Sequence, residues 1–284
     1  MEIINRRQRM SSIARKLRRE NKTVAFVPTM GALHDGHLSL IKEARQMADV
    51  LIVSIFVNPA QFNQTEDYDK YPRDLTSDAA LLTEYQVDYI FAPDADEIYP
   101  PGFSTYIYVE GLTDTLEGAS RPGHFRGVAT IVTILFNTIR PDFAIFGQKD
   151  AQQGAVIKHL VQDLGFETEI VMMPIVREES GLAMSSRNAH LSGEDRQKAS
   201  IIYKSLREAK IAFKNGERDA SELAEIVRRG LASETAALID YVAVVDMDTF
   251  EPIEKVGENP VLVAVAVSFG KTRLIDNAVF NRRQ

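Results

Sequence analysis

The fold is decided by the stretch Thr23-Val24-Ala25-Phe26-Val27 and by the loop that follows it, Pro28-Thr29-Met30-Gly31-Ala32-Leu33-His34-Asp35-Gly36-His37. The first five residues are mostly β-branched and apolar, which predicts a short buried strand. Beyond the loop, Leu38, Ile41, Ala44 and Ala48 recur at the spacing of one helix face. The stretch therefore predicts a strand, a glycine-containing loop and a helix, as in the first half of a βαβ unit.

The same alternation continues along the N-terminal part of the chain. Further strands are predicted at residues 50–57, 87–91, 142–146 and 169–173, and the helices between them at residues 74–85, 128–139 and 151–164. A proline- and glycine-rich stretch at residues 93–127 is expected to be irregular. Strands alternating with helices are typical of a mainly parallel sheet covered on both faces. We therefore expect an α/β domain over residues 1–175, a doubly wound and Rossmann-like sheet.

The pattern changes after Pro174. Two helical stretches, at residues 193–214 and 220–231, precede three strands at residues 240–245, 261–267 and 272–275. The apolar run at residues 261–267 suits a buried strand and is far too short to cross a bilayer. We expect a second, smaller α+β domain over residues 176–284, acting as a lid.

Composition excludes several classes of function. The 40 acidic and 33 basic side chains give a net charge of −7, so no global basic field attracts a nucleic-acid backbone. Met10, Ile13, Ala14 and Leu17 share one face of a predicted amphipathic helix, and the basic residues around it are better explained as a solvated face than as a nucleic-acid arm. The absence of cysteine excludes disulfides, thiolate nucleophiles and cysteine-ligated metals. With neither a signal peptide nor a long apolar run, we expect a cytoplasmic protein without nucleic-acid or membrane partners.

Polar residues follow the predicted strands, at the sheet edge where ligands of parallel sheets bind. The second strand leads to Asn58-Pro59-Ala60-Gln61-Phe62, and the strand at residues 142–146 leads to Gly147-Gln148-Lys149-Asp150-Ala151-Gln152-Gln153. The last strand of the first domain leads to Met184-Ser185-Ser186-Arg187-Asn188. We expect these loops and the one after the first strand to converge.

The loop containing His34 and His37 suggests a phosphate site. Its two glycines let the backbone approach a ligand, and the following helix presents N–H groups and the positive end of its dipole. Two imidazoles beside such a terminus suit phosphate oxygens. Two alternatives stay open: both histidines cap the turn structurally, or they form a metal pair, for which no third ligand is evident nearby.

The other loops supply cations and amides. Lys149 and Arg187 are each compatible with an ordinary surface position, but their places after strands favour a role in offsetting phosphate charge. The side chains of Ser185 and Ser186 add short hydroxyl donors. Gln61 and Gln153 both donate and accept hydrogen bonds, which suits a hydroxy acid that carries a carboxylate.

These segments, together with Arg121-Pro122-Gly123-His124-Phe125-Arg126-Gly127-Val128, resemble the pantothenate synthetase (pantoate–β-alanine ligase) family in sequence and order. The pieces around His34 and Arg187 also resemble the nucleotide signatures of class I aminoacyl-tRNA synthetases and related nucleotidyltransferases.

The resemblance implies ATP-dependent condensation of pantoate with β-alanine to give pantothenate, AMP and pyrophosphate through a pantoyl adenylate. It implies catalytic roles for His37, His34, Lys149 and Arg187, and pantoate binding by Gln61 and Gln153. Mg²⁺ is implied with the ATP phosphates, without an assigned ligand in the chain, and a homodimer is implied as well. The ATP-binding residues that it implies are Met30, Gly31, Ala32, Leu33, His34, Asp35, Gly36, His37, Gly147, Gln148, Lys149, Asp150, Val176, Met184, Ser185, Ser186 and Arg187.

Three further hypotheses stay open. A nucleotidyltransferase would leave the nucleotide on its product, and a tRNA synthetase-like enzyme would need an anticodon-binding domain. A non-catalytic nucleotide-binding regulator would need the phosphate loop but not the paired glutamines.

Residues 62–71 are polar and suit either a gate over the site or an ordinary exposed loop.

Overall fold

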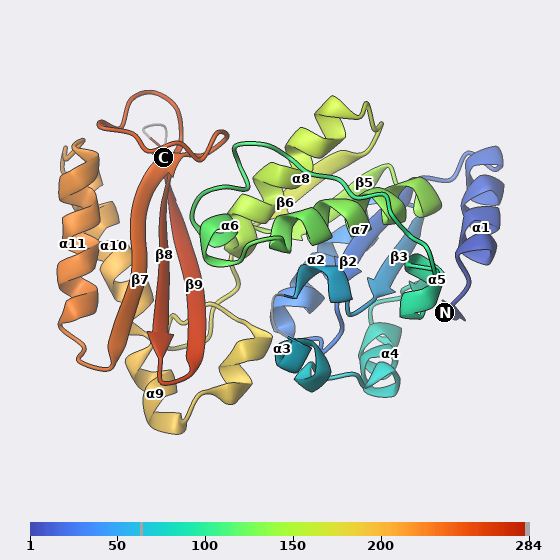
Figure 1. The fold of residues 1–284 in the computed structure, drawn as a ribbon, viewed down its shortest axis with the longest axis horizontal. Coiled ribbons are helices and arrows are strands. Elements are labelled where there is room, and N and C mark those ends of the chain that lie inside the picture. The colour runs from blue at the N-terminus through green and yellow to red at the C-terminus, as the bar shows by residue number, and fades with distance from the viewer. Residues whose placement is uncertain (63–64, 282–284) are drawn as a thin grey trace. The chain divides into compact units, whose positions relative to one another are not determined.

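The computed structural model describes residues 1–62 and 65–281, and its contacts divide the chain into two compact units (Figure 1). Unit 1 comprises Met1–Gly147 and Val156–Met173. Unit 2 comprises Gln148–Ala155 and the chain from Pro174 onward. The segment that carries Lys149 and Gln153 therefore groups with the C-terminal part of the chain, although it directly follows a strand of unit 1.

Unit 1 is built on a six-stranded parallel sheet with the order β1-β4-β3-β2-β5-β6. Its strands are β1 (Glu2–Ile4), β2 (Val24–Thr29), β3 (Val50–Ile55), β4 (Tyr89–Phe91), β5 (Phe143–Gly147) and β6 (Glu169–Met173). The central strand β2 pairs with β3 on one side and with β5 on the other; Ala25, for example, lies opposite both Leu51 and Phe143. The strand order reverses direction between β2 and β5, which makes their carboxyl ends the expected ligand-binding point.

Helices cover both faces of this sheet. Alternate residues of β2, such as Val24 and Phe26, face a core shared with α1, α7 and α8, and the intervening residues, such as Ala25 and Val27, face a core shared with α2 and α4. The bounds are α1 (Arg7–Arg19), α2 (Asp35–Met47), α4 (Leu75–Thr83), α7 (His124–Ile139) and α8 (Ala151–Asp163). The buried side chains of α1 are Met10, Ile13, Ala14 and Leu17, as the sequence predicts. The predicted doubly wound α/β class is confirmed.

Short elements complete unit 1. The stretch predicted to be irregular, residues 93–127, contains two short helices, α5 (Ala95–Ile98) and α6 (Glu117–Ser120), and the first turn of α7, which begins four residues before the predicted start. After the 3₁₀ helix η1 (Pro59–Gln61) the chain forms α3 (Thr65–Lys70); residues 63 and 64 of the segment considered as a gate lie outside the described residues. Among residues 1–62 and 65–281, no helix combines the length and apolar character that spanning a membrane requires.

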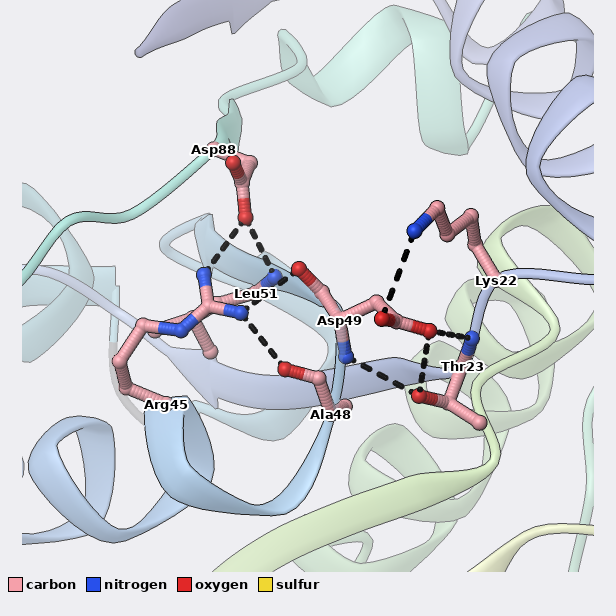
Figure 2. A network of polar contacts seen from close by, with 7 residues as sticks. All are labelled: Lys22, Thr23, Arg45, Ala48, Asp49, Leu51 and Asp88. Carbon is pink, nitrogen blue, oxygen red and sulfur yellow. Dashed lines mark hydrogen bonds and ion pairs between the residues drawn. The ribbon is translucent and has the colours of Figure 1, made fainter.

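A polar network holds the amino ends of β2 and β3 (Figure 2). Arg45, in the last turn of α2, donates to the carboxylate of Asp88 at 2.7 Å and to the carbonyl of Asp49 at 2.7 Å, and Asp88 also accepts the N–H of Leu51 at 2.8 Å. The Asp49 carboxylate accepts the N–H of Thr23 at 3.0 Å and its hydroxyl at 3.1 Å, and these bonds lower the pKa of Asp49. Because the network lies at the opposite ends of the strands from their carboxyl termini, we assign it a structural role.

Unit 2 contains an antiparallel sheet with the order β7-β8-β9. Its strands are β7 (Ala237–Asp246), β8 (Val261–Phe269) and β9 (Thr272–Phe280). Alternate residues of β8 pack into one core with α10 (Ile201–Lys214) and α11 (Ala220–Ala232), which Figure 1 shows beside the sheet. The predicted smaller α+β fold is confirmed.

The single helix predicted at residues 193–214 is wrong, because the structure forms α9 (Gly193–Lys198) and α10 instead. At the break, Ser200 N–H donates to the carbonyl of Gln197, and Ile202 N–H donates to that of Ala199. These bonds span three residues rather than four, so the backbone tightens locally and the α-helical ladder is interrupted.

Candidate functional site

The loop after β2 is held by a carboxylate from another helix. Gly31 (φ +82°) and Ala32 (φ +51°) both adopt left-handed conformations. Asp78, on α4, accepts the backbone N–H of Ala32 at 3.0 Å and that of Leu33 at 2.9 Å, and only 4% of Asp78 is exposed. A Cβ atom on Gly31 would lie 2.8 Å from Asp78 Oδ2, so glycine is needed both for the backbone turn and for this close approach.

His34 and His37 meet at the start of α2. His34 is the N-cap residue, and its Nδ1 accepts the N–H of Gly36 at 3.2 Å. His37 Nδ1 accepts the N–H of His34 at 3.4 Å, and the two ring centroids lie 4.1 Å apart at an interplanar angle of 33°. A neutral imidazole that accepts at Nδ1 carries its hydrogen on Nε2. The histidines therefore cap the turn, and the same capping fixes each Nε2–H as a donor, the polarity that a phosphate oxygen requires.

The metal alternative gains no support from geometry. Within residues 1–62 and 65–281, no group of three or more histidine, aspartate or glutamate side chains is arranged to hold a metal ion. The buried carboxylate that contacts this loop, Asp78 of α4, uses both oxygens to accept backbone N–H groups.

Gln61 is brought against the same loop. It ends η1 and is buried, with its Nε2 directed at Met30 Sδ at 3.1 Å. Its Oε1 accepts a hydrogen bond from Asn58 Nδ2 at 3.0 Å. A thioether is a weak acceptor, so the contact with Met30 does little to satisfy the amide donor. Within unit 1 the predicted ATP loop and one predicted pantoate amide are therefore neighbours.

The start of α7 positions the backbone of Gln61. A Cβ atom on Gly127 would overlap the Ala60 carbonyl and lie 2.6 Å from Gln61 N, so only glycine lets α7 approach this closely. His124 Nδ1 is 2.9 Å from the Gln61 carbonyl, and Arg121 Nη1 is 3.1 Å from His124 Nε2. Because a guanidinium only donates, His124 accepts at Nε2 and donates from Nδ1. The segment at residues 121–128 thus supports the glutamine.

In unit 2, the strand β9 holds the backbone around Lys149. Asn277 Nδ2 donates to the carbonyls of Gln148 at 2.9 Å and Lys149 at 3.0 Å, both in the 3₁₀ helix η2 (Gln148–Asp150). Lys149 Nζ lies 3.7 Å from Asp150 Oδ1, and the lysine side chain is 18% exposed. Gln153 lies two residues into α8 and is half-buried.

The neighbouring residue of β9 holds the segment that leads to Arg187. Arg177 donates to both oxygens of Asp276, at 2.6 and 3.0 Å, and its guanidinium lies 3.9 Å from the centre of the Tyr203 ring. Burial raises the pKa of Asp276, and the hydrogen bonds and charge of Arg177 oppose that rise. Beside this pair, Met184 N–H donates to the Val176 carbonyl at 2.9 Å. Two of the predicted ATP residues are thereby adjacent.

Arg187 lies in a second 3₁₀ helix, η3 (Ser186–His190). The hydroxyl of Ser185 caps this helix by accepting the N–H of Arg187 at 3.3 Å. Asn188 donates to Glu178 Oε1 at 2.7 Å and to the Ala183 carbonyl at 3.0 Å, which ties η3 to the preceding hairpin. The polar residues that the sequence predicts as a group therefore form one locally braced turn.

Asp78, Asp276 and Asn277 are not among the site residues predicted from the sequence. For the last two a signal existed: two polar residues interrupt the apolar strand around Leu274, and buried polar groups require partners. For Asp78 the local sequence is that of an ordinary helix, and its partners lie 45 and 46 residues away.

Comparisons with known proteins agree with this picture. The chain matches the family described as Pantoate-beta-alanine ligase over residues 2–279. The "Pantothenate synthetase" of Caldicellulosiruptor saccharolyticus is 52% identical over 279 residues, covering 98% of this chain and 99% of that protein.

Solved structures are similar as well. A pantothenate synthetase from Thermus thermophilus has a TM-score of 0.91 and 44% identity, covering 98% of this chain and 99% of its own. A Francisella tularensis ligase, complexed with "Beta-gamma ATP" and β-alanine, has a TM-score of 0.80 and 37% identity, covering 100% of this chain and 98% of its own. With matches of this extent in both sequence and structure, the chain belongs to the pantoate–β-alanine ligase family.

Proposed function

We propose that this chain condenses pantoate with β-alanine at the expense of ATP, giving pantothenate, AMP and pyrophosphate through a pantoyl adenylate. Formation of pantothenate is the reaction of the family to which the chain belongs. The structural observation that carries the proposal is the histidine pair at the start of α2, whose Nδ1 atoms both accept backbone N–H groups and whose Nε2 atoms are therefore both donors.

The first step activates pantoate. A carboxylate acylates an amine poorly, because the oxide that would leave is too basic, whereas AMP is a good leaving group. An oxygen of the pantoate carboxylate attacks the α-phosphorus of ATP, and the bond to pyrophosphate breaks. Because an anion attacks a polyanion, the protein contributes mainly by positioning the reactants and offsetting their charge.

We assign these duties to four side chains. His34 and His37 donate hydrogen bonds from Nε2 to phosphate oxygens, and His37 is assigned to the departing pyrophosphate, whose growing charge its hydrogen bond offsets. Lys149 and Arg187 offset the charge that builds on the phosphates. The remaining proposed ATP contacts are residues 30–33, 35, 36, 147, 148, 150, 176 and 184–186.

The second step forms the amide. The β-alanine amine attacks the acyl carbonyl of the adenylate, the bond to AMP breaks, and the amine loses a proton. Gln61 and Gln153 are proposed to hold the pantoate hydroxyl and carboxylate groups in the first step and the pantoyl group of the adenylate in the second. The use of β-alanine as the amine is supported by the Francisella tularensis relative, which is described as complexed with a nucleotide and β-alanine.

Mg²⁺ is proposed to be bound through the phosphate oxygens of ATP, which is a common mode for this ion. The described residues offer no group of three or more carboxylate or imidazole ligands that would form a dedicated cage. No step above is therefore assigned to the ion.

We further propose that the protein is a cytoplasmic homodimer. Within each chain, residues 1–175 are proposed to bind ATP and pantoate, and residues 176–284 to act as a lid.

The test is product analysis after incubation with ATP, pantoate and β-alanine. The proposal requires pantothenate and AMP in equal amounts. A product that retains the nucleotide would instead indicate a nucleotidyltransferase, and ATP binding without turnover would indicate a regulator.

A substitution of Gln153 distinguishes pantoate binding from ATP binding. Gln153→Ala is expected to weaken pantoate binding far more than ATP binding, because it leaves substrate groups without hydrogen-bond partners. Equal losses for both substrates would reject the assignment of Gln153 to pantoate.

A further inference from the structure

We propose that Tyr99 is a positioning residue for pantoate: through Asn58, its hydroxyl holds the Gln61 amide so that Gln61 offers an N–H donor to the substrate. The inference rests on the proposed role of Gln61 in pantoate binding. Tyr99 itself is not assigned any contact with the substrate.

The orientation of the Asn58 amide is fixed by two backbone groups of opposite polarity. Its Oδ1 accepts the N–H of Ala60 at 3.3 Å, and its Nδ2 donates to the carbonyl of Gly127 at 3.1 Å. A backbone N–H only donates and a carbonyl only accepts, so exchanging the oxygen and nitrogen would break both bonds. Asn58 is 1% exposed, so water does not compensate for such a loss.

The orientation of the Asn58 amide determines the orientation of the Gln61 amide. Asn58 Nδ2 also donates to Gln61 Oε1 at 3.0 Å, which occupies the glutamine oxygen as an acceptor. The glutamine nitrogen is then the group left to meet a ligand, and its present partner, Met30 Sδ at 3.1 Å, is a weak acceptor. The carboxylate of a hydroxy acid carries only acceptor oxygens, and it therefore matches an amide presented by its N–H side.

Tyr99 supplies the shortest bond in this chain of contacts. Its hydroxyl donates to Asn58 Oδ1 at 2.7 Å, against 3.3 Å for the N–H of Ala60. The ring is fixed at the end of α5, with its centroid 5.0 Å from that of Phe103 and 6.4 Å from that of Phe56. Burial raises the pKa of Tyr99 well above its usual value, so the hydroxyl remains a protonated donor at physiological pH.

Removing this hydroxyl tests the proposal. Tyr99→Phe keeps the ring and is expected to raise the KM for pantoate about five- to tenfold, the effect of losing one buried hydrogen bond of about 1–1.4 kcal/mol. The KM for ATP is expected to stay within about twofold, on the expectation that ATP does not contact Gln61. A matched control is Tyr108→Phe, which removes an exposed hydroxyl that donates to Asp114 Oδ1 at 2.6 Å. We expect it to change neither KM.

A double-mutant cycle separates positioning from simple packing. If Tyr99 acts through Gln61, Tyr99→Phe adds less than about twofold to the pantoate KM in a Gln61→Ala background, because coupled residues are not additive. Gln61→Glu provides a second readout, since it keeps the size of the side chain but replaces the donor with an acceptor. It is expected to weaken pantoate binding at least as much as Gln61→Ala.

The outcomes are distinguishable. An unchanged pantoate KM in Tyr99→Phe, an equal rise for both substrates, or a full effect in the Gln61→Ala background would each overturn the proposal. Retention of pantoate affinity by Gln61→Glu would overturn the donor assignment even if Tyr99→Phe folded poorly. These results would leave the proposed function intact, because the wild-type chain would still form pantothenate. Failure of the wild-type chain to do so would reject both.

Discussion

The carboxylate of Asp78 accepts the backbone N–H of Leu33 at 2.9 Å, so a side chain of α4 fixes the backbone immediately before His34. The second Asp78 oxygen accepts the N–H of Ala32, a residue with positive φ. Both bonds are charge-assisted and belong to a buried carboxylate, so the loop is held in one conformation, as its proposed role in binding ATP phosphates requires.

We expect Asp78→Ala to raise the KM for ATP by about tenfold or more while changing the KM for pantoate much less. Hydrogen bonds to charged groups contribute about 1.5–3 kcal/mol each, and their loss frees the left-handed loop to relax. Steady-state kinetics with each substrate varied separately measures this. Asp74→Ala is the control, because Asp74 caps the same helix by accepting the N–H of Ser77. Similar effects of the two substitutions would mean that α4 stability alone is responsible.

Lys149→Ala is expected to lower kcat by about 10²–10³, or about 2.7–4 kcal/mol, as for loss of one preorganised electrostatic donor. In the proposed mechanism, charge builds on the phosphates as pyrophosphate leaves, and the role we propose for Lys149 is to stabilise the transition state more than bound ATP. Single-turnover formation of the adenylate at saturating ATP and pantoate measures the effect, with a melting curve to verify folding. Lys158→Ala, which removes an exposed lysine of α8, serves as the control. An unchanged adenylation rate would remove Lys149 from the chemistry.

Asn277→Ala should reproduce a weaker form of the Lys149 defect. The substitution leaves the carbonyls of Gln148 and Lys149 without this donor, so the lysine is held less firmly. We expect kcat to fall about tenfold, corresponding to about 1.4 kcal/mol, with a modest fall in melting temperature. Asn137→Ala removes an exposed amide that donates to the carbonyl of Thr133, and it should leave kcat unchanged. A drop in melting temperature with normal kcat would show that Asn277 is only structural.

Gly127→Ala is expected to destabilise the protein, although alanine is ordinarily favoured over glycine inside a helix by about 0.5–1 kcal/mol. A Cβ atom there would overlap the carbonyl of Ala60, and overpacking of this kind costs about 1–3 kcal/mol. Denaturant unfolding measures directly whether the substitution lowers or raises the free energy of unfolding. Gly193→Ala, also in a helix but facing open space, is expected to be neutral or stabilising. A stabilised Gly127→Ala protein would contradict the close packing of α7 against η1.

Much of the fold follows from hydrophobic periodicity. The residues predicted to be buried on the first helix are buried in α1, and each strand expected in the parallel sheet is present. The central strands β2 and β3 have the long apolar runs of strands that are covered on both faces. The strand β1 is not predictable in this way, since three residues carry no period, and its formation depends on pairing with β4. The break before α10 depends on a local change of hydrogen bonding at Ser200, which the apolar pattern does not encode.

Some residues of the candidate site can be predicted from the sequence, and others cannot. His34, His37, Gln61, Lys149 and Arg187 are recognisable from the sequence because they follow strands in polar segments that resemble those of a known family. The residues that hold these side chains in place are not recognisable from the sequence, because their hydrogen bonds join distant positions. Asp78 lies 46 residues from Ala32, and Asn277 lies 128 residues from Lys149. Such contacts exist only once the chain is folded.

The most direct test of the proposed chemistry is isotope exchange between labelled pyrophosphate and ATP, measured with pantoate present and β-alanine absent. An enzyme that forms a pantoyl adenylate reverses that step without the amine, so we predict label in ATP that depends on pantoate. Exchange that strictly required β-alanine would contradict a separately formed adenylate.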